Sequence, residues 1–281
     1  MAIKVVIDSS SDINAKEAQE LGIHMMPMNI TFGDKDYLDG VDLLPNEFFD
    51  LLESSKDLPT TSLINSFRFG EEFAKLTANG DQLIVITISS KLSGTYQAAV
   101  QASLDYPGKV FVIDSLNATA GERVLAQYAM QLIQKGLPIT QIVEELNTAK
   151  NRIRVIALVD TLEYLKKGGR ISTAAAFAGK LLALKPIICV IDGEVKMISK
   201  AIGLKNTCNL LNKLIEEKGG LNTDMPYCLI WSGNSTTNLD TFIKNNPQIS
   251  QISSPLPRYT LGGTIGTHVG PGAAGVVFFE K

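Results

Sequence analysis

A buried strand that runs into a hydroxyl-rich turn and then a helix is the feature that most constrains this fold. Residues 83–88 form a nearly unbroken apolar run of strand length, rich in β-branched side chains. Such a run is typical of a strand buried on both faces, and strands of that kind belong to parallel sheets. Residues 98–102 are rich in helix formers, and no breaker follows until Pro107. The stretch therefore predicts a strand–turn–helix unit of an α/β fold.

The turn between this strand and helix, residues 89–97, has two interpretations. It reads Ser-Ser-Lys-Leu-Ser-Gly-Thr-Tyr-Gln. A hydroxyl-rich turn with one glycine ahead of a helix directs free backbone N–H groups and the positive end of the helix dipole at an anion. The same residue types are equally typical of ordinary helix capping by Ser or Thr. The local sequence leaves both interpretations open.

The first half of the chain repeats the pattern of a strand followed by polar residues. Residues 3–7 form an apolar strand that ends in the polar turn 8–12, and residues 109–113 form another that ends in Asp114 and Ser115. Because the carboxyl ends of parallel strands meet at one edge of a sheet, these polar residues mark the edge where open α/β folds bind ligands. Residues 23–32 predict a further strand. Pro27 lies inside it, which indicates either an edge position or a later start of the strand.

The second half of the chain has a different organisation. A strand is expected at residues 153–159, and residues 187–191 lead through Asp192-Gly193 into 195–198, which predicts a β-hairpin. A hairpin requires antiparallel pairing, so the second sheet should be mixed. We therefore expect two domains, a parallel-sheet α/β domain at residues 1–159 and a mixed-sheet α/β domain at residues 160–281.

Composition and spacing exclude several classes of protein. The net charge is −3 and there is no block of Lys or Arg, which argues against a nucleic-acid partner. The three cysteines are odd in number and far apart, and the two histidines lack ligand spacing, so we expect neither a disulfide framework nor a metal site. There is no Walker phosphate-binding motif. The chain enters a strand at once and no apolar run approaches 18 residues, so we expect a soluble, cytoplasmic protein.

Two further stretches carry candidate ligand contacts. Gly168 and Gly169 permit close backbone approach and leave Arg170 able to point into a cleft as a forked donor, although a basic, solvated helix end is the plainer interpretation. His268 lies in a run from 261 to 275 that is rich in glycine and proline, where a ligand could come close and accept a hydrogen bond. A lone histidine is more often a satisfied structural residue.

Taken together, these stretches resemble the DegV family of bacterial proteins, which includes the fatty-acid-binding subunits of fatty acid kinase. The motifs occur in order over nearly the whole chain, and their combination is far more specific than any one of them. The stretches that carry the resemblance are residues 8–12, 59–62, 89–97, 165–172, 184–187 and 265–272.

The resemblance implies a fold and a ligand. The fold is a three-layer α/β/α domain with a parallel sheet plus a two-layer α/β domain with a mixed sheet, in agreement with the segments above. The ligand is one long-chain fatty acid, with its carboxylate between the domains, its tail buried, and His268 reaching the carboxylate from the second domain. The positions implied to hold or approach the carboxylate are Thr61, Ser62, Ser93, Gly94, Thr95, Arg170 and His268.

The resemblance also implies a role and partners. We expect a non-catalytic carrier, with the bound fatty acid as ligand and no cofactor, that presents the carboxylate to a separate ATP-dependent kinase subunit and makes at most transient contact with a membrane. The apolar, small-residue segment 174–184 is a candidate to line the tail, with a buried core helix as the local alternative. The chain departs from the family at residues 63–65, often Gln-Pro-Ser, and at Ile202, where many members have Arg.

Two alternatives from other classes stay open. Ser93 and His268 could form a nucleophile–base pair in an acyl hydrolase or acyltransferase, although Ser93 is not in a nucleophile-elbow motif. The chain could also be a lipid-sensing regulatory protein that works without a kinase partner.

Overall fold

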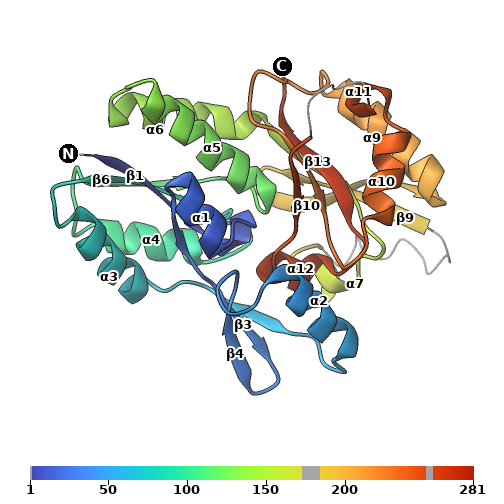
Figure 1. The fold of residues 1–281 in the computed structure, drawn as a ribbon, viewed down its shortest axis with the longest axis horizontal. Helices are drawn as coiled ribbons and strands as arrows, with labels where there is room; N and C mark the ends of the chain where they lie inside the picture. The colour runs from blue at the N-terminus through green and yellow to red at the C-terminus, as the bar shows by residue number, and fades with distance from the viewer. Residues whose placement is uncertain (1, 173–183, 251–255) are drawn as a thin grey trace.

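The chain folds into two α/β halves, each built on its own sheet (Figure 1). The structure is a computed structural model that describes residues 2–172, 184–250 and 256–281. The first half is a three-layer α/β/α arrangement with a parallel sheet, and the second half is a two-layer arrangement with a mixed sheet. This confirms the fold class predicted from the sequence.

The first half contains a four-stranded parallel sheet in the order β2-β1-β6-β7. Helices α3 and α4 pack together on one face, and α5 and α6 pack together on the other. The predicted strand at 83–88 is β6, in the interior of the sheet, where its side chains are almost entirely buried. The elements of this half are β1 (Ile3–Asp8), η1 (Ser9–Ser11), α1 (Ala15–Leu21), β2 (His24–Met26), α3 (Ser66–Thr77), β6 (Gln82–Thr87), α4 (Thr95–Ser103), β7 (Val110–Asp114), α5 (Ala120–Gln134), α6 (Ile139–Ala149) and η2 (Lys150–Arg152).

The second half contains a six-stranded sheet in the order β10-β9-β8-β13-β11-β12, in which only β11 and β12 run parallel. The predicted hairpin is present as β9 and β10, and α9 and α10 cover one face of the sheet. The elements of this half are β8 (Ile153–Leu158), α7 (Glu163–Lys167), β9 (Leu184–Ile191), β10 (Glu194–Ile202), α9 (Leu204–Glu217), β11 (Cys228–Trp231), α10 (Thr237–Lys244), α11 (Pro247–Ser250), β12 (Arg258–Thr260), α12 (Gly263–Val269) and β13 (Ala274–Phe279).

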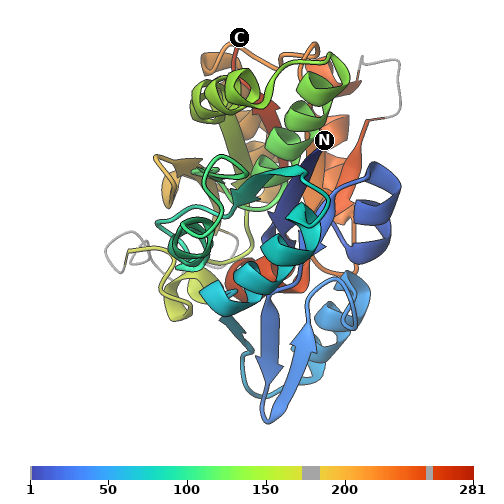
Figure 2. The same ribbon diagram turned by 90° about the vertical axis from the view of Figure 1, so that its left-hand side faces the viewer.

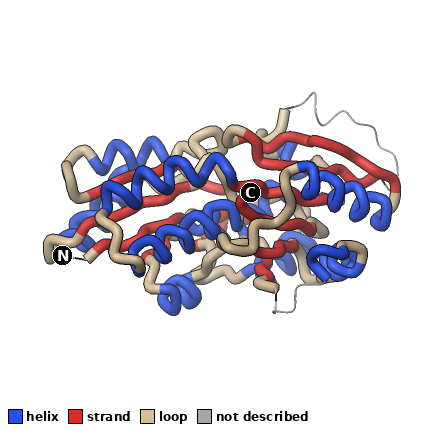
Figure 3. Tube along the Cα trace, turned by 90° about the horizontal axis from the view of Figure 1, so that it is seen from above, coloured by secondary structure: helices blue, strands red, loops and turns tan. Residues whose placement is uncertain are grey.

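Helix α5 joins the two halves. It packs against β1 and β6 of the parallel sheet and against β8, β11 and β13 of the mixed sheet, and its first two turns are completely buried. Seen from above, the helices flank the strands of both sheets (Figure 3). Strand β8 pairs within the mixed sheet, so a boundary drawn by sheet membership would precede Ile153. The division of the chain after residue 159 stays a prediction.

A small antiparallel sheet corrects the single strand expected at residues 23–32. That stretch splits at Pro27, which has no N–H to donate to a sheet. Its first part is β2 of the parallel sheet, and its second part, β3 (Asn29–Phe32), pairs with β4 (Lys35–Leu38) and β5 (Thr60–Ser62). Figure 2 shows the β3–β4 hairpin projecting from the body of the molecule, followed by α2 (Pro45–Ser54).

The glycine-rich run near the C-terminus contains the short helix α12, which was not expected because glycine disfavours helices. Its glycines allow close packing against α2. A Cβ added to Gly263 would lie 2.8 Å from Cδ2 of Phe48, and one added to Gly266 would lie 2.5 Å from Cε1 of the same ring. Among the described residues, no helix is both long and apolar enough to cross a membrane.

The packing of α12 predicts opposite effects for two glycine substitutions. Gly266→Ala places a methyl group where the ring of Phe48 lies. Overpacking of this kind should lower the free energy of unfolding by about 1–3 kcal/mol. Gly70→Ala, in α3, meets no heavy atom within 4 Å and should stabilise by about 0.5–1 kcal/mol. Urea unfolding of both variants measures the difference. Equal stability of the two would contradict the close seating of α12.

Candidate functional site

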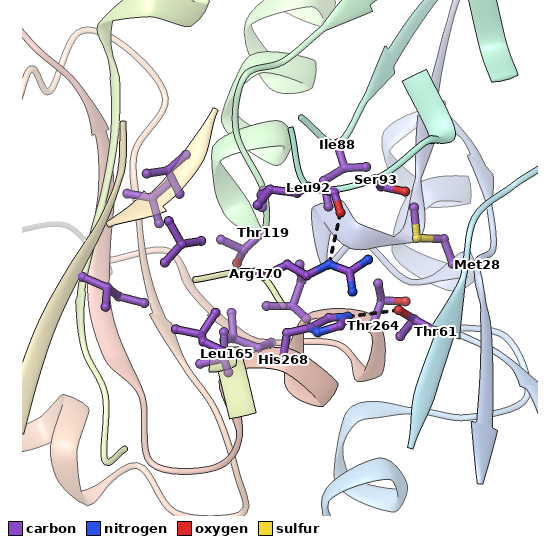
Figure 4. Close-up of a pocket in the computed structure, with 18 of the residues that line it drawn as sticks. Met28, Thr61, Ile88, Leu92, Ser93, Thr119, Leu165, Arg170, Thr264 and His268 are labelled. Atoms are coloured by element: carbon purple, nitrogen blue, oxygen red, sulfur yellow. Dashed lines mark hydrogen bonds between the residues drawn. The ribbon is translucent and has the colours of Figure 1, made fainter. Parts of the chain in front are cut away.

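A cavity of about 400 Å³ lies between the two halves (Figure 4). Its volume is within the range of small-molecule binding sites. Most of its lining is aliphatic. Strands of the mixed sheet supply part of it, and the first half contributes residues from its loops and from the small strand β5. The apolar lining residues are Met28, Leu63, Ile88, Leu92, Ala118, Val155, Ala157, Leu165, Ile188, Val190, Val195, Ile230, Leu261, Ile265, Val269 and Ala273.

Polar side chains gather at one end of this cavity, and the central pair among them comes from opposite halves of the chain. Oγ1 of Thr61, in β5, lies 3.0 Å from Nε2 of His268, in α12. Nδ1 of the same ring is buried without a hydrogen-bond partner among the described residues, and Gly168 packs directly against it. The close approach explains the glycine, because a Cβ at position 168 would lie 2.2 Å from Nδ1.

The surroundings of His268 favour a neutral ring with its proton on Nε2. A proton on Nδ1 would leave a buried N–H without an acceptor, which is rarer in proteins than an unsatisfied acceptor. In the favoured tautomer Nε2–H donates to Thr61, and the threonine hydroxyl keeps its own proton to donate into the cavity. Burial of the ring, and then the charge of Arg170, lowers the pKa of His268 to about 4.

The turn ahead of α4 brings Ser93 and Gly94 to the same cavity. The Ser93 hydroxyl lies 2.9 Å from the hydroxyl of Thr95 and accepts a weak hydrogen bond from its backbone N–H at 3.3 Å. Thr95 itself is completely buried and does not line the cavity. Gly94 is the N-cap residue of α4 and has no side chain, so the N-cap position itself makes no capping bond. The Ser93 hydroxyl binds the first backbone N–H of the helix and also lines the cavity, so both interpretations of this turn stay open.

Ser62 and Arg170 complete the predicted set at the polar end. Ser62 follows Thr61 in β5 and is exposed, whereas Arg170 is half-buried after α7. Nε of Arg170 donates to the carbonyl of Leu92 at 3.2 Å, and Nη1 donates to the carbonyl of Gly168 at 2.6 Å. These two bonds turn the guanidinium into the cavity beside His268 (Figure 4), rather than out into solvent as a helix-end charge.

Two threonines of the cavity were missed from the sequence. Thr119 precedes α5 with φ 55°, and its hydroxyl donates to Asp12. Thr264 lies in the first turn of α12. Both line the cavity near the predicted residues (Figure 4). Thr119 does follow the end of a parallel strand by a few residues, which was the available signal, but nothing local marks Thr264.

The carboxylates at the ends of the parallel strands bind backbone N–H groups of the loops. Asp8 accepts hydrogen bonds from the backbone N–H groups of Ser10 and Ile88, and Asp114 accepts them from Ser90 and Leu116. Burial raises the pKa of Asp8 to about 6. These groups shape the edge of the sheet on which the cavity opens, and neither carboxylate is among its lining residues.

The geometry weighs against a serine nucleophile. A nucleophile and its base need to lie within hydrogen-bond reach of each other. In the part of the chain that the structure describes, the hydroxyl of Ser93 pairs with Thr95, while Nε2 of His268 pairs with Thr61. The described residues also hold no group of three or more metal-ligating side chains. The predicted tail-lining segment 174–184 lies outside the described residues except for its last residue, Leu184, which begins β9.

Comparison with known proteins agrees with this fold. The model of the family described as "Uncharacterised protein, DegV family" matches residues 2–281. The chain belongs to the DegV family. A DegV domain-containing protein of Caldanaerobacter subterraneus is 35% identical over 283 residues. The alignment covers 99% of this chain and 99% of that protein.

Solved structures of DegV proteins match the fold over its whole length. One of these structures, described as showing fatty acid binding of a DegV family protein from Thermus thermophilus, has a TM-score of 0.88 at 28% identity. DegV of Bacillus subtilis, described as a fatty acid binding protein, has a TM-score of 0.83 at 28% identity. Each of these two alignments covers 100% of this chain and 100% of the solved chain. A stearic acid-binding protein from Eubacterium ventriosum has a TM-score of 0.84 at 26% identity and covers 100% of this chain and 99% of its own.

The lowered pKa of His268 predicts a neutral ring throughout the physiological range. In the ligand-free protein, NMR of the imidazole should show no titration between pH 8 and pH 5, and protonation only near pH 4. Because the folded pKa lies below the ordinary value of 6.5, the contribution of His268 to stability is complete above pH 6.5 and is lost as the pH falls toward 4. A His268→Gln variant assigns the signal, and a midpoint near 6.5 would contradict the buried, neutral ring.

Proposed function

We propose that this protein binds one long-chain fatty acid, with the tail in the cavity and the carboxylate at its polar end. The observation that carries the proposal is that polar and apolar side chains occupy separate parts of one cavity. Thr61, Ser93, Arg170 and His268 lie at one end, and aliphatic side chains line the rest (Figure 4). The fatty-acid-binding proteins among the solved DegV structures, at 28% identity, support the same ligand class.

The tail supplies most of the binding free energy in this proposal. Burial of each methylene gives about 0.8 kcal/mol, so a dozen buried methylenes give roughly 10 kcal/mol of gross driving force. Each hydrogen bond from a hydroxyl to the charged carboxylate adds about 1.5–3 kcal/mol net. The apolar lining therefore sets affinity, and the polar end sets which way the ligand lies.

The carboxylate is held by hydroxyl groups and one nearby cation. The Thr61 hydroxyl, oriented by His268, donates from one side, and the Ser93 hydroxyl faces it from the turn ahead of α4. Arg170 adds a positive charge beside them without giving up its two carbonyl contacts. A neutral His268 suits this arrangement because it orients Thr61 and leaves the positive charge to Arg170.

Presentation of the carboxylate to a separate ATP-dependent kinase subunit is the finer part of the proposal. Two observations support it. Ser62 and Gly94 at the polar end are exposed, so the head group lies near the surface. The sequence has no Walker phosphate-binding motif, so a phosphoryl donor would have to be held by a partner. Ile202, where the resemblance implies arginine in many family members, is 62% exposed. A kinase contact made by that arginine is absent in this chain, which counts against the kinase partner more than against lipid binding. A cytoplasmic location stays a prediction.

Fatty-acid binding is tested by the ligand that the protein retains and by its preference for tail length. Mass spectrometry of protein purified under native conditions should find one fatty acid per chain. In delipidated protein, each added methylene should strengthen binding about fourfold until the cavity is full, as expected from about 0.8 kcal/mol per methylene. Thr61→Val should weaken all acids about tenfold without changing that slope, since it removes only a head-group contact. A protein that neither retains nor takes up fatty acid would refute the proposal.

Kinase presentation is tested by reconstitution. The fatty-acid-loaded protein, mixed with ATP and the ATP-binding subunit of a bacterial fatty acid kinase, should yield an acyl phosphate, and omission of either protein should abolish it. The Thr61→Val variant, loaded at saturating fatty acid, should give product at a reduced rate. Normal fatty-acid binding with no product and no complex with the subunit would favour the lipid-sensing alternative.

A further inference from the structure

The buried carboxylate of Asp39 holds the first turn of α12, the helix that carries His268. Asp39 directly follows β4 and is 1% exposed. Its Oδ1 accepts the backbone N–H of Gly263 at 2.9 Å, and its Oδ2 accepts that of Thr264 at 3.2 Å. Burial raises the pKa of Asp39, and the hydrogen bonds that its carboxylate accepts act in the opposite direction. The first half of the chain thus fixes the start of a helix from the second.

A second buried carboxylate holds the adjacent residue. Oδ1 of Asp12 accepts the backbone N–H of Gly262 at 2.7 Å. Its other oxygen accepts the hydroxyl of Thr119, which lines the cavity. Three consecutive backbone N–H groups at the start of α12 are therefore bound by carboxylates from the other half.

The small sheet contacts α12 at both ends. Asn29 of β3 pairs with Leu38, the residue before Asp39, and Ile30 of the same strand pairs with Thr61. Leu38, which precedes Asp39, and Thr61 are thereby paired with neighbouring positions of one strand. Asp39 binds the start of α12, and Thr61 binds His268 at its end. Together they span the length of the helix.

A helix of this length depends on such contacts for its position. Seven residues are too few to hold a helix without tertiary support. Thr264 and His268 are separated by one turn, a rise of about 6 Å, so a shift at the first residue is carried to the second. A hydrogen bond of 3.0 Å is lost after a displacement of less than about 1 Å. The seating of the first turn therefore controls the Thr61–His268 contact.

We propose that Asp39 is a positioning residue for the carboxylate end of the cavity, because it fixes α12 so that His268 stays hydrogen-bonded to Thr61. Asp12 supports the same helix end through Gly262. Asp39 is not among the described residues that line the cavity, so its effect on the ligand passes through the helix. Asp12 also binds the cavity-lining Thr119, so Asp39 is the cleaner residue to test. The inference rests on the proposed fatty-acid binding.

The test compares Asp39→Asn with Asp42→Asn. The amide keeps the size of Asp39 but offers one acceptor oxygen to two N–H donors, and its own NH₂ faces one of them. Asp42 lies in the same loop, is exposed, and accepts only the backbone N–H of Leu38 at 2.6 Å among the described hydrogen bonds. The ligands are hexadecanoic acid and hexadecanol, which share a tail but differ at the head group.

Asp39→Asn should weaken binding of the acid about tenfold and of the alcohol less than twofold, since about 1.4 kcal/mol corresponds to tenfold. Asp42→Asn should change neither. In a His268→Ala background, Asp39→Asn should add less than twofold, because residues that act through one contact are not additive. Equal losses for acid and alcohol, or full additivity with His268→Ala, would overturn the proposal.

Two further measurements keep the outcome decisive. If the wild-type protein binds neither ligand, fatty-acid binding fails, and the ¹⁵N signal of His268 Nε2 in the ligand-free protein still tests positioning. Asp39→Asn should shift that signal and Asp42→Asn should not; an unchanged signal overturns the inference. If circular dichroism shows that Asp39→Asn is unfolded, Asp12→Asn takes its place. This variant weakens the bonds to Gly262 and Thr119, and it should shift the same ¹⁵N signal of His268 and weaken acid binding about threefold. An unchanged His268 signal would overturn the inference.

Discussion

The seating of α12 is the contact on which the site depends. Its glycines allow the helix to lie against the ring of Phe48, and its first three N–H groups are bound by Asp12 and Asp39 from the other half. Its last turn then brings His268 to Thr61. Backbone N–H groups bonded to buried carboxylates are costly to separate, because each carboxylate would be left buried without its partners. The two halves are therefore held together next to the polar end of the cavity.

The apolar and the polar lining residues of the cavity come from different kinds of element. The aliphatic lining comes from strand residues of the mixed sheet, such as Val155 and Ile188, from α12, and from loops of the first half, such as those at Ile88 and Ala118. The hydroxyls and the two basic side chains come from the short strand β5, from turns next to helices, and from α12. A ligand with a long apolar tail and a small anionic head matches this division.

Local patterns predicted the fold well and the site in part. Three features could be predicted because each depends on consecutive residues. They are the strand at 83–88, the β9–β10 hairpin, and the change from parallel to mixed pairing. The split of residues 23–32 at Pro27 could not, since both parts read as strand and only their partners differ. Six of the seven predicted site residues line the cavity, while Thr95 is buried behind Ser93. Whether these residues bind a ligand stays a prediction.

By itself, the sequence determined the main strands of both halves, the presence of two kinds of sheet, and the residue types at the turns, since propensity and hydrophobic period are local properties. Only the tertiary structure decided that a glycine-rich run becomes a helix and that Arg170 turns inward. It also decided that His268 meets Thr61, 207 positions earlier in the chain. The physical reason is that these features depend on what packs against them, namely Phe48, Gly168 and the carboxylate of Asp39, and no pattern within one segment records its distant neighbours.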